Sequence, residues 1–399
     1  MTLRADPPAS AALDPPAGVV AEVAGPAFTA REAAAAIALG LLALLIAGLM
    51  SLLLPALAEE GRLSAQGIGL TAMLESLSTA VVTGAAGMLL KPVRLRAVAI
   101  IAGLALVALD LATLRASGPG VMAVRALAGV PEGILLWISI GFISRTATPE
   151  RWAAVLFTGM GLTQVAVATA LSGWVLPRFG ANGGYLIVAA AAALVLPVAL
   201  FLPRSLGAPV GEGQTSGPPP LRGWVALAGT LCMAASLNAV AVYVIPLARE
   251  AGLSVGVGRT AITVALACQM AGGAFAAALA GRVRYITVFW VCAAVFLCTW
   301  AVYAMGAPAW LFIAVAGLAG LAAFVAGPFL VPMTVEADPS RRAAMQSGAV
   351  QLLAGAFGPL LASLAVSAHS VRGVLVLAVA LQAVGLAIAT ALHRAAARS

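Results

Sequence analysis

Charged residues are scarce in this chain: they make up 9% of its 399 residues, whereas hydrophobic residues make up 62%. Soluble domains carry about a quarter charged residues, so the composition excludes an ordinary soluble protein. Uncharged apolar runs recur along the whole length, and a run of about twenty residues can cross about 30 Å of hydrocarbon as a helix. Because a helix satisfies its own backbone hydrogen bonds in lipid, we expect an all-α protein that crosses the bilayer many times.

Histidine, lysine and cysteine are also rare, which argues against a zinc site and against a nucleotide-binding loop. The chain has two histidines, four cysteines and a single lysine, Lys91. No Cys/His group has the spacing of a zinc site, and no glycine-rich loop precedes the Lys-Ser/Thr pair that binds nucleotide phosphates. We therefore expect no metal, no cofactor, no ATP-driven pumping and no enzymatic activity. The net charge of +8 does not indicate nucleic acid, because the arginines stand at the ends of apolar runs and set topology there.

Twelve apolar segments follow one another, six in each half of the chain. We expect them at about 33–57, 67–90, 95–114, 120–144, 152–176, 183–202, 223–247, 259–280, 286–305, 310–333, 343–366 and 374–392. Two equal halves around a Pro- and Gly-rich stretch indicate two six-helix bundles joined by a linker. The predicted parts are a disordered cytoplasmic tail (1–32), an N-terminal bundle (33–202), a cytoplasmic linker (203–222), a C-terminal bundle (223–392) and a cytoplasmic tail (393–399).

Basic residues are distributed unevenly between the segments, and this predicts the orientation. With the N-terminus in the cytoplasm, the outer loops contain only Arg62, Arg115, Arg178, Arg249, Arg259 and Arg372. The inner loops and tails then contain the other basic residues that lie outside the membrane, as the positive-inside rule requires. We therefore expect both termini in the cytoplasm and a multi-pass monomer in a cell inner membrane.

The loop between the second and third segments carries a family motif in part. It reads Gly87-Met88-Leu89-Leu90-Lys91-Pro92-Val93-Arg94-Leu95-Arg96. With the six-plus-six layout, this glycine followed by basic residues resembles the major facilitator superfamily of transporters, but Lys91 replaces the family's acid and Arg94 its second glycine. The resemblance implies that this loop, with Gly87, Lys91, Arg94 and Arg96, helps to stabilise one conformation of the transporter. Because the acid is missing here, the stabilising contacts must differ from those of the family.

The fourth segment resembles the same family more closely, because Gly129 follows Arg125 after four residues. Antiporters of the family often carry a Gly-Pro pair in the fifth segment. That pair is missing here, although Gly358-Pro359 stands in the eleventh segment. The resemblance implies a secondary transporter with a site between two bundles, and it leaves the direction of transport open.

Four ionisable residues stand inside apolar segments, where a charge near the centre costs about 2.5–3.5 kcal/mol. They are Glu75, Asp110, Arg125 and Glu132. Arg125 and Glu132 are spaced to share one helix face. Glu132 is predicted to bind a coupling proton because burial disfavours its charged form; the alternative is a structural hydrogen bond to a neighbouring helix.

The other three ionisable residues are candidates for ion pairs with one another or for contact with a proton or substrate. Glu75 lies in a polar stripe on the second segment, so it is a second candidate for the proton or the substrate, and otherwise an ion-pair partner of Arg125 or a gate residue. Asp110 and Arg125 are expected at similar depth and predict a structural ion pair, which is destabilised when one partner is removed. Alternatively Arg125 binds a substrate carboxylate.

Uncharged polar residues inside the segments are candidates for the lining of a cavity. They are Ser78, Thr79, Gln164, Asn238, Tyr243, Gln269, Gln346 and Gln351. The alternative for each is a hydrogen bond between helices. Since the second half has no ionisable residue deep in the membrane, we expect the first half to handle charge and the second half to form an uncharged wall.

These patterns together predict secondary active transport of a small organic solute, coupled to protons. We favour export of an amphipathic or cationic compound, because we expect two candidate carboxylates and large apolar walls in the cavity. One alternative is proton-coupled uptake of an organic anion held by Arg125. Another is a membrane sensor or assembly factor that has the same fold but moves nothing.

Overall fold

The computed structural model describes residues 28–146, 149–206, 218–279, 281–339, 342–367 and 370–396. Much of the predicted tails and linker lies outside the described residues, namely 1–27, 207–217 and 397–399. Within the described residues the regular structure is helical, apart from one isolated β-bridge between Val93 and Ser205. The all-α prediction is thereby confirmed.

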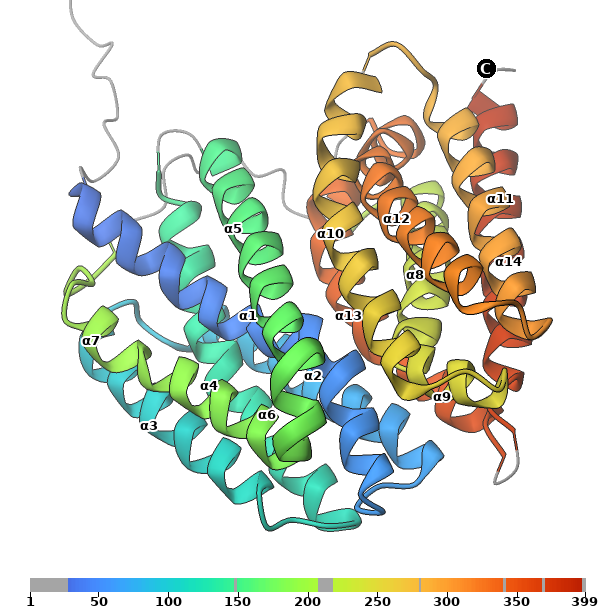
Figure 1. Ribbon diagram of the computed structural model, residues 1–399. Coiled ribbons are helices and arrows are strands. Elements are labelled where there is room, and N and C mark those ends of the chain that lie inside the picture. The colour runs from blue at the N-terminus through green and yellow to red at the C-terminus, as the bar shows by residue number, and fades with distance from the viewer. Residues whose placement is uncertain are drawn as a thin grey trace, which may run out of the picture.

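Helices fill both halves of the described chain (Figure 1). The first half contains α1 (Ala30–Glu59), α2 (Ala65–Leu89), α3 (Leu95–Thr113), α4 (Pro119–Ile143), α5 (Pro149–Ala170), the π-helical turn η1 (Leu171–Val175), α6 (Leu176–Ala193) and α7 (Val195–Ala199). The second half contains α8 (Leu221–Ala241), α9 (Val244–Glu250), α10 (Val255–Leu279), α11 (Tyr285–Ala304), α12 (Ala309–Ala337), α13 (Arg342–Ala365) and α14 (Gly373–Ala396). α1 begins where Thr29 and Glu32 form a capping box, which satisfies free backbone N–H groups at the helix start.

Eleven helical stretches in the described residues are long and apolar enough to cross a membrane, and one of them is long enough to cross twice. This stretch runs from Val155 to Ala199 over 45 residues, and a helix of that length would be about 68 Å long, twice the hydrocarbon thickness. Gly180 interrupts it with φ 60° and ψ −160°, a conformation that glycine adopts readily. After Gly180 the chain runs back, and α6 packs against η1 and α1 (Figure 1). The described chain therefore has twelve crossings, as the segment pattern predicts.

The two halves form two bundles that lie side by side (Figure 1). In the first, α4 packs against α1, α2 and α3; in the second, α12 packs against α10 and α11, and α8 against α13 and α14. Across the bundles, α2 packs against α13, α5 against α10, and α1 against α9 and α10. The start of α1 and the end of α14 lie at the same end of the molecule (Figure 1).

Polar contacts join the bundles at the opposite end, where α1 ends and α10 begins. Glu59 of α1 pairs with Arg259 of α10 at 3.1 Å. Tyr243, at the break between α8 and α9, donates to the carbonyl of Ala65 at 2.9 Å and accepts from the N–H of Gly69 at 3.2 Å. Between η1 and α10, the hydroxyls of Ser172 and Thr263 are 3.0 Å apart. These contacts hold the bundles together at this end.

Candidate functional site

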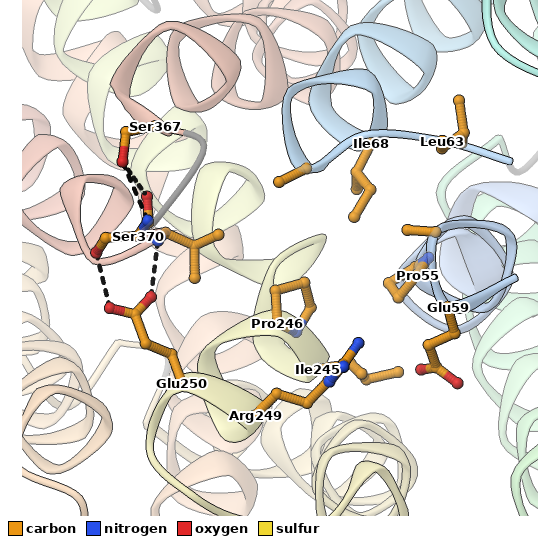
Figure 2. Close-up of a pocket in the computed structure, with 13 residues that line it drawn as sticks. Pro55, Glu59, Leu63, Ile68, Ile245, Pro246, Arg249, Glu250, Ser367 and Ser370 are labelled. Carbon is orange, nitrogen blue, oxygen red and sulfur yellow. Dashed lines mark hydrogen bonds between the residues drawn. The ribbon is translucent and has the colours of Figure 1, made fainter. Parts of the chain in front are cut away.

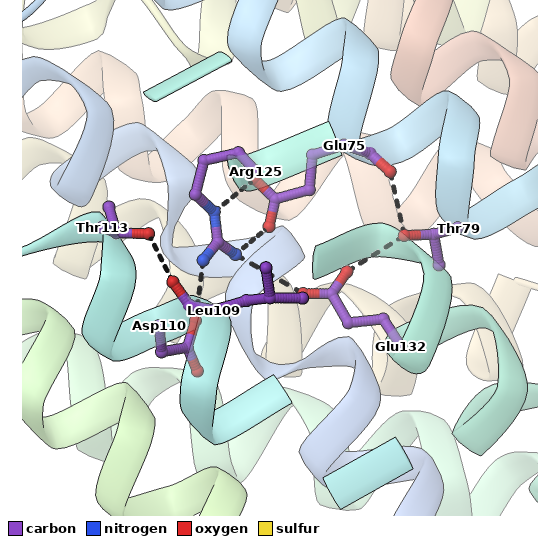
Figure 3. Close-up of polar contacts among 7 residues, drawn as sticks. All are labelled: Glu75, Thr79, Leu109, Asp110, Thr113, Arg125 and Glu132. Atoms are coloured by element: carbon purple, nitrogen blue, oxygen red, sulfur yellow. Dashed lines mark hydrogen bonds and ion pairs between the residues drawn. The ribbon is translucent and has the colours of Figure 1, made fainter. Parts of the chain in front are cut away.

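A buried charged cluster is built by α2, α3 and α4 around Arg125, whose side chain is 0% exposed (Figure 3). Its Nε donates to Glu75 Oε2 at 3.0 Å and its Nη2 donates to Glu75 Oε1. Its Nη1 donates to Asp110 Oδ1 at 2.7 Å. The face of the Tyr185 ring on α6 lies 5.4 Å from the guanidinium carbon, a cation–π distance. The Asp110–Arg125 pair and the Glu75–Arg125 pair thus occur in one network.

Glu132 completes the cluster from α4, two turns along the helix from Arg125. Its Oε1 lies 3.5 Å from Arg125 Nη2, and its Oε2 lies 3.0 Å from the hydroxyl of Thr79 (Figure 3). The same Thr79 hydroxyl lies 2.9 Å from the carbonyl oxygen of Glu75. Oε1 of Glu132 and Oδ2 of Asp110 are buried and have no hydrogen-bond partner among the described residues. One guanidinium therefore faces three carboxyl groups, and two carboxyl oxygens have no donor.

Two glycines of α4 bring α2 close enough to form this cluster. A Cβ on Gly129 would lie 2.5 Å from the carbonyl oxygen of Glu75, and a Cβ on Gly133 would lie 2.7 Å from that of Thr79. Only a residue without a side chain fits at these distances. Small residues at helix contacts let backbones approach in this way in membranes. Ser78 lies at the same α2–α4 contact, because its Cβ would be 2.8 Å from a Cβ on Gly129.

A central cavity of about 350 Å³ lies between the bundles, apart from the charged cluster. α1 and α5 contribute part of its wall, including Gly48, Ser51 and Gln164, and α8 to α12 contribute the rest. No residue of this lining is charged, and neither Glu75, Arg125 nor Glu132 belongs to it. The expectation that carboxylates stand in the cavity therefore does not hold for this cavity. α1 nevertheless connects the two sites, because it forms cavity wall and also packs against α2 and α4.

The predicted polar residues divide between the cavity and other positions. Gln164, Asn238 and Gln269 line the central cavity. Thr79 bonds within the cluster, and Tyr243 joins the bundles. Ser78 lies at the α2–α4 contact, and Gln346 and Gln351 are exposed on α13.

The loop with the partial family motif is fixed within the first half of the chain. Arg94 has φ 55° and stands directly before α3, and Arg96 Nε donates to the carbonyl of Leu202 at 2.7 Å. The N–H of Leu206 donates to the Pro92 carbonyl at 3.0 Å, which adds to the Val93–Ser205 bridge. These bonds tie the loop to the end of the first bundle. Gly87 lies in the last turn of α2, and the side chain of Lys91 makes no hydrogen bond with the described residues.

A second cavity of about 480 Å³ opens at the end where the bundles are joined (Figure 2). Glu59, Arg249 and Glu250 contribute charge to its wall. Glu250 accepts from Ser370 Oγ and from the N–H of Val371, both at 2.7 Å. Sequence reasoning missed the Glu59–Arg259 contact; its only signal was that both residues stand at predicted segment ends.

Comparison with known proteins identifies the architecture. The family model of the Major Facilitator Superfamily matches residues 35–363. A crystal structure of a variant of the nucleoside transporter NupG has a TM-score of 0.69 at 12% identity, covering 91% of this chain and 99% of that one. A bacterial homologue of the human lysosomal transporter Spinster, in an inward-facing and unoccupied conformation, has a TM-score of 0.58 at 13% identity, covering 93% and 96%. No curated protein matches in sequence.

Proposed function

Because this chain belongs to the Major Facilitator Superfamily, and is thus a membrane transporter and not an enzyme, we propose that it moves a small organic solute by proton-coupled secondary transport. The central cavity is the solute site, and the cluster around Arg125 binds the coupling proton. Glu132 is the carboxyl group that changes protonation, while Glu75 and Asp110 hold the guanidinium. The observation that carries this proposal is the excess of buried carboxyl groups over cations.

The hydrogen-bond pattern at Thr79 supports a proton on Glu132. A hydroxyl has one hydrogen to donate, yet the Thr79 hydroxyl is within 3.0 Å of two acceptors, the Glu75 carbonyl and Glu132 Oε2. If Glu132 is protonated at Oε2, it donates to Thr79 Oγ and Thr79 donates to the carbonyl. Every hydrogen then has an acceptor, and the cluster carries one negative charge fewer. The ionised form lacks this arrangement, so the two protonation states differ in their bonds to α2.

α2 is the element through which the protonation of Glu132 acts on the two bundles. One face of α2 carries Glu75 and Thr79, and its first turns contact the second half at Tyr243. A Cβ on Gly69 would lie 2.5 Å from the carbonyl oxygen of Pro359, so α2 and α13 are also in close contact. A proton shifts the equilibrium between two conformations only if it binds one of them more tightly. A change of the bonds between Glu132 and α2 supplies that difference.

The cargo follows from the wall of the cavity. Its apolar side chains favour an amphipathic compound, and with it export. A cationic compound is not favoured, because no carboxylate is in this wall to pair with it. Uptake of an organic anion by Arg125 is disfavoured, since all three nitrogens of the guanidinium already bind carboxylates. In this proposal the protein lies in a cell inner membrane with both termini in the cytoplasm. The contacts of Glu59 and Tyr243, at the opposite end of the molecule, then close the gap between the bundles on the outer side.

Flux measurements in proteoliposomes test this function. Solutes that raise the thermal stability of the purified protein are loaded, a pH gradient is imposed, and solute movement is followed. Proton-coupled export moves solute against the direction of the protons, and proton-coupled uptake moves both together. Solute binding without flux under any gradient would contradict transport and would favour the sensor.

A further inference from the structure

Two aromatic side chains in the wall of the central cavity have polar groups without a partner. Trp300 and Tyr303 line the cavity and are each 3% exposed. Neither the indole N–H nor the phenol O–H makes a hydrogen bond with any described residue. Buried Trp and Tyr usually find a partner for these groups. Their free donors at a cavity wall therefore indicate a ligand with acceptor atoms.

The three carboxamides of the cavity also keep free hydrogen-bonding atoms. Asn238 Nδ2 donates to the carbonyl of Ala234 at 2.9 Å, and Gln164 Nε2 donates to that of Leu44 at 3.0 Å. The oxygen of each remains free to accept. The carboxamide of Gln269 makes no hydrogen bond within the described protein. Donors and acceptors thus both face the cavity.

Flat apolar surface stands beside these polar groups. Phe296, Trp300 and Tyr303 lie on one face of α11, and the rings of Phe296 and Trp300 stack with centroids 6.1 Å apart at 21°. Aromatic rings bind other rings in offset or edge-to-face contact. A volume of about 350 Å³ is near the small end of typical ligand pockets. The wall suits a compact, planar ligand.

The absence of charge from this wall selects against ions. An ion in the cavity would lose water without gaining a counter-ion, which is costly, whereas a neutral polar group only needs hydrogen bonds. Resting on the proposed transport function, we infer that the solute is an electrically neutral, planar ring compound with both hydrogen-bond donors and acceptors, and that Asn238 and Gln269 determine this specificity. Nucleobase-like and carboxamide-bearing rings have this chemistry.

Binding of matched ring compounds tests the inference. Nicotinamide is neutral, nicotinate is an anion and 1-methylnicotinamide is a cation, while the ring is the same; uridine and uridine monophosphate form a second, larger pair. Isothermal titration calorimetry on the purified wild type should show neutral members binding at least about 10-fold more tightly than charged ones, since burying an unpaired ion is costly. Asn238→Ala and Gln269→Ala should each weaken neutral binding by about 2- to 10-fold.

Gln351→Ala is the matched control, because this carboxamide is exposed on α13 and should leave binding unchanged. The inference is overturned if a charged member binds as tightly as its neutral partner, if neither nicotinamide nor uridine binds, or if both cavity variants bind like the wild type. Flux separates this from the function itself. Proton-driven movement of a charged solute would support the transport function and refute the inference about the solute. Binding of a neutral compound without flux would support the inference and refute the transport function.

Discussion

Replacement of Glu132 by Gln tests how the buried cluster couples a proton to transport. The amide has the shape of the protonated carboxylic acid, and its N–H can donate to Thr79 as the acid would. The variant therefore fixes the cluster in its proton-bound form. Gradient-driven accumulation should fall to the level that wild type reaches without a gradient. Exchange of solute across the membrane at equal pH should continue within about twofold, because its barrier needs no proton release.

The magnitude follows from the contact between Arg125 and Glu132. At 3.5 Å, two unit charges attract by about 5 kcal/mol with an effective dielectric constant of about 20. Desolvation costs several kcal/mol for each buried ion, so the two effects nearly cancel. Doubling the distance would halve the attraction, and the loss of about 2.4 kcal/mol would raise the proton affinity of Glu132 about 60-fold. Both residues stand on α4, but Glu75 of α2 binds the same guanidinium. A shift of α2 that draws the guanidinium away from Glu132 is thus sufficient to change the binding of the proton.

Proteoliposomes with an imposed pH gradient provide the assay. Glu336→Gln is the control, because Glu336 lies outside the cluster, where it pairs with His393 at 3.2 Å, and this variant should retain gradient-driven accumulation. The reasoning is refuted if Glu132→Gln accumulates solute with the gradient as well as wild type does. Loss of both accumulation and exchange would show that Glu132 is needed for movement itself and not for coupling.

Three further variants test the structural basis. Arg125→Met leaves buried carboxylates without their cation and should cost about 3–5 kcal/mol, seen as a large fall in thermal stability in detergent; an unchanged midpoint would contradict the network. Gly129→Ala should cost about 1–3 kcal/mol by forcing α2 from α4, whereas Gly173→Ala, which meets nothing within 4 Å, should not; equal effects would refute the close contact. Glu59→Gln removes the pair with Arg259 and should raise the outward-open population by up to about 5-fold, measured by distances between spin labels. An unchanged population would show that this ion pair does not hold the outer end closed.

The sequence predicts the number of crossings and the two bundles because both depend on local composition. Each run of apolar residues is recognisable alone, and the turn at Gly180 falls between two predicted segments. The break of the seventh segment at Val242 and Tyr243 is not predictable in this way. It depends on Tyr243 bonding to α2, a partner far away in the chain.

The charged cluster is predictable in part. The cost of charge in lipid singles out Glu75, Asp110, Arg125 and Glu132 one by one. The spacing of Arg125 and Glu132 places them on one helix face, but nothing local says that α2 and α3 bring their carboxylates to the same guanidinium. That arrangement depends on close packing of three helices, which Gly129 permits.

The lining of the cavity is the least predictable feature. In a soluble protein polarity separates the inner face of a helix from the outer face, but lipid is as apolar as a helix contact. Gln269 and Gln351 therefore look alike in the sequence, although one lines the cavity and the other is exposed on α13. Tertiary packing alone decides between them.

Infrared difference spectroscopy tests most directly whether the cluster around Arg125 binds the coupling proton. Purified protein is titrated with pH, and the C=O band of a protonated carboxylic acid is followed in wild type and in Glu132→Gln. If Glu132 carries the coupling proton, wild type shows a band that disappears as the pH rises, and this band is missing from the variant. A band of the same size in both proteins, or no such band at any pH, would contradict this role.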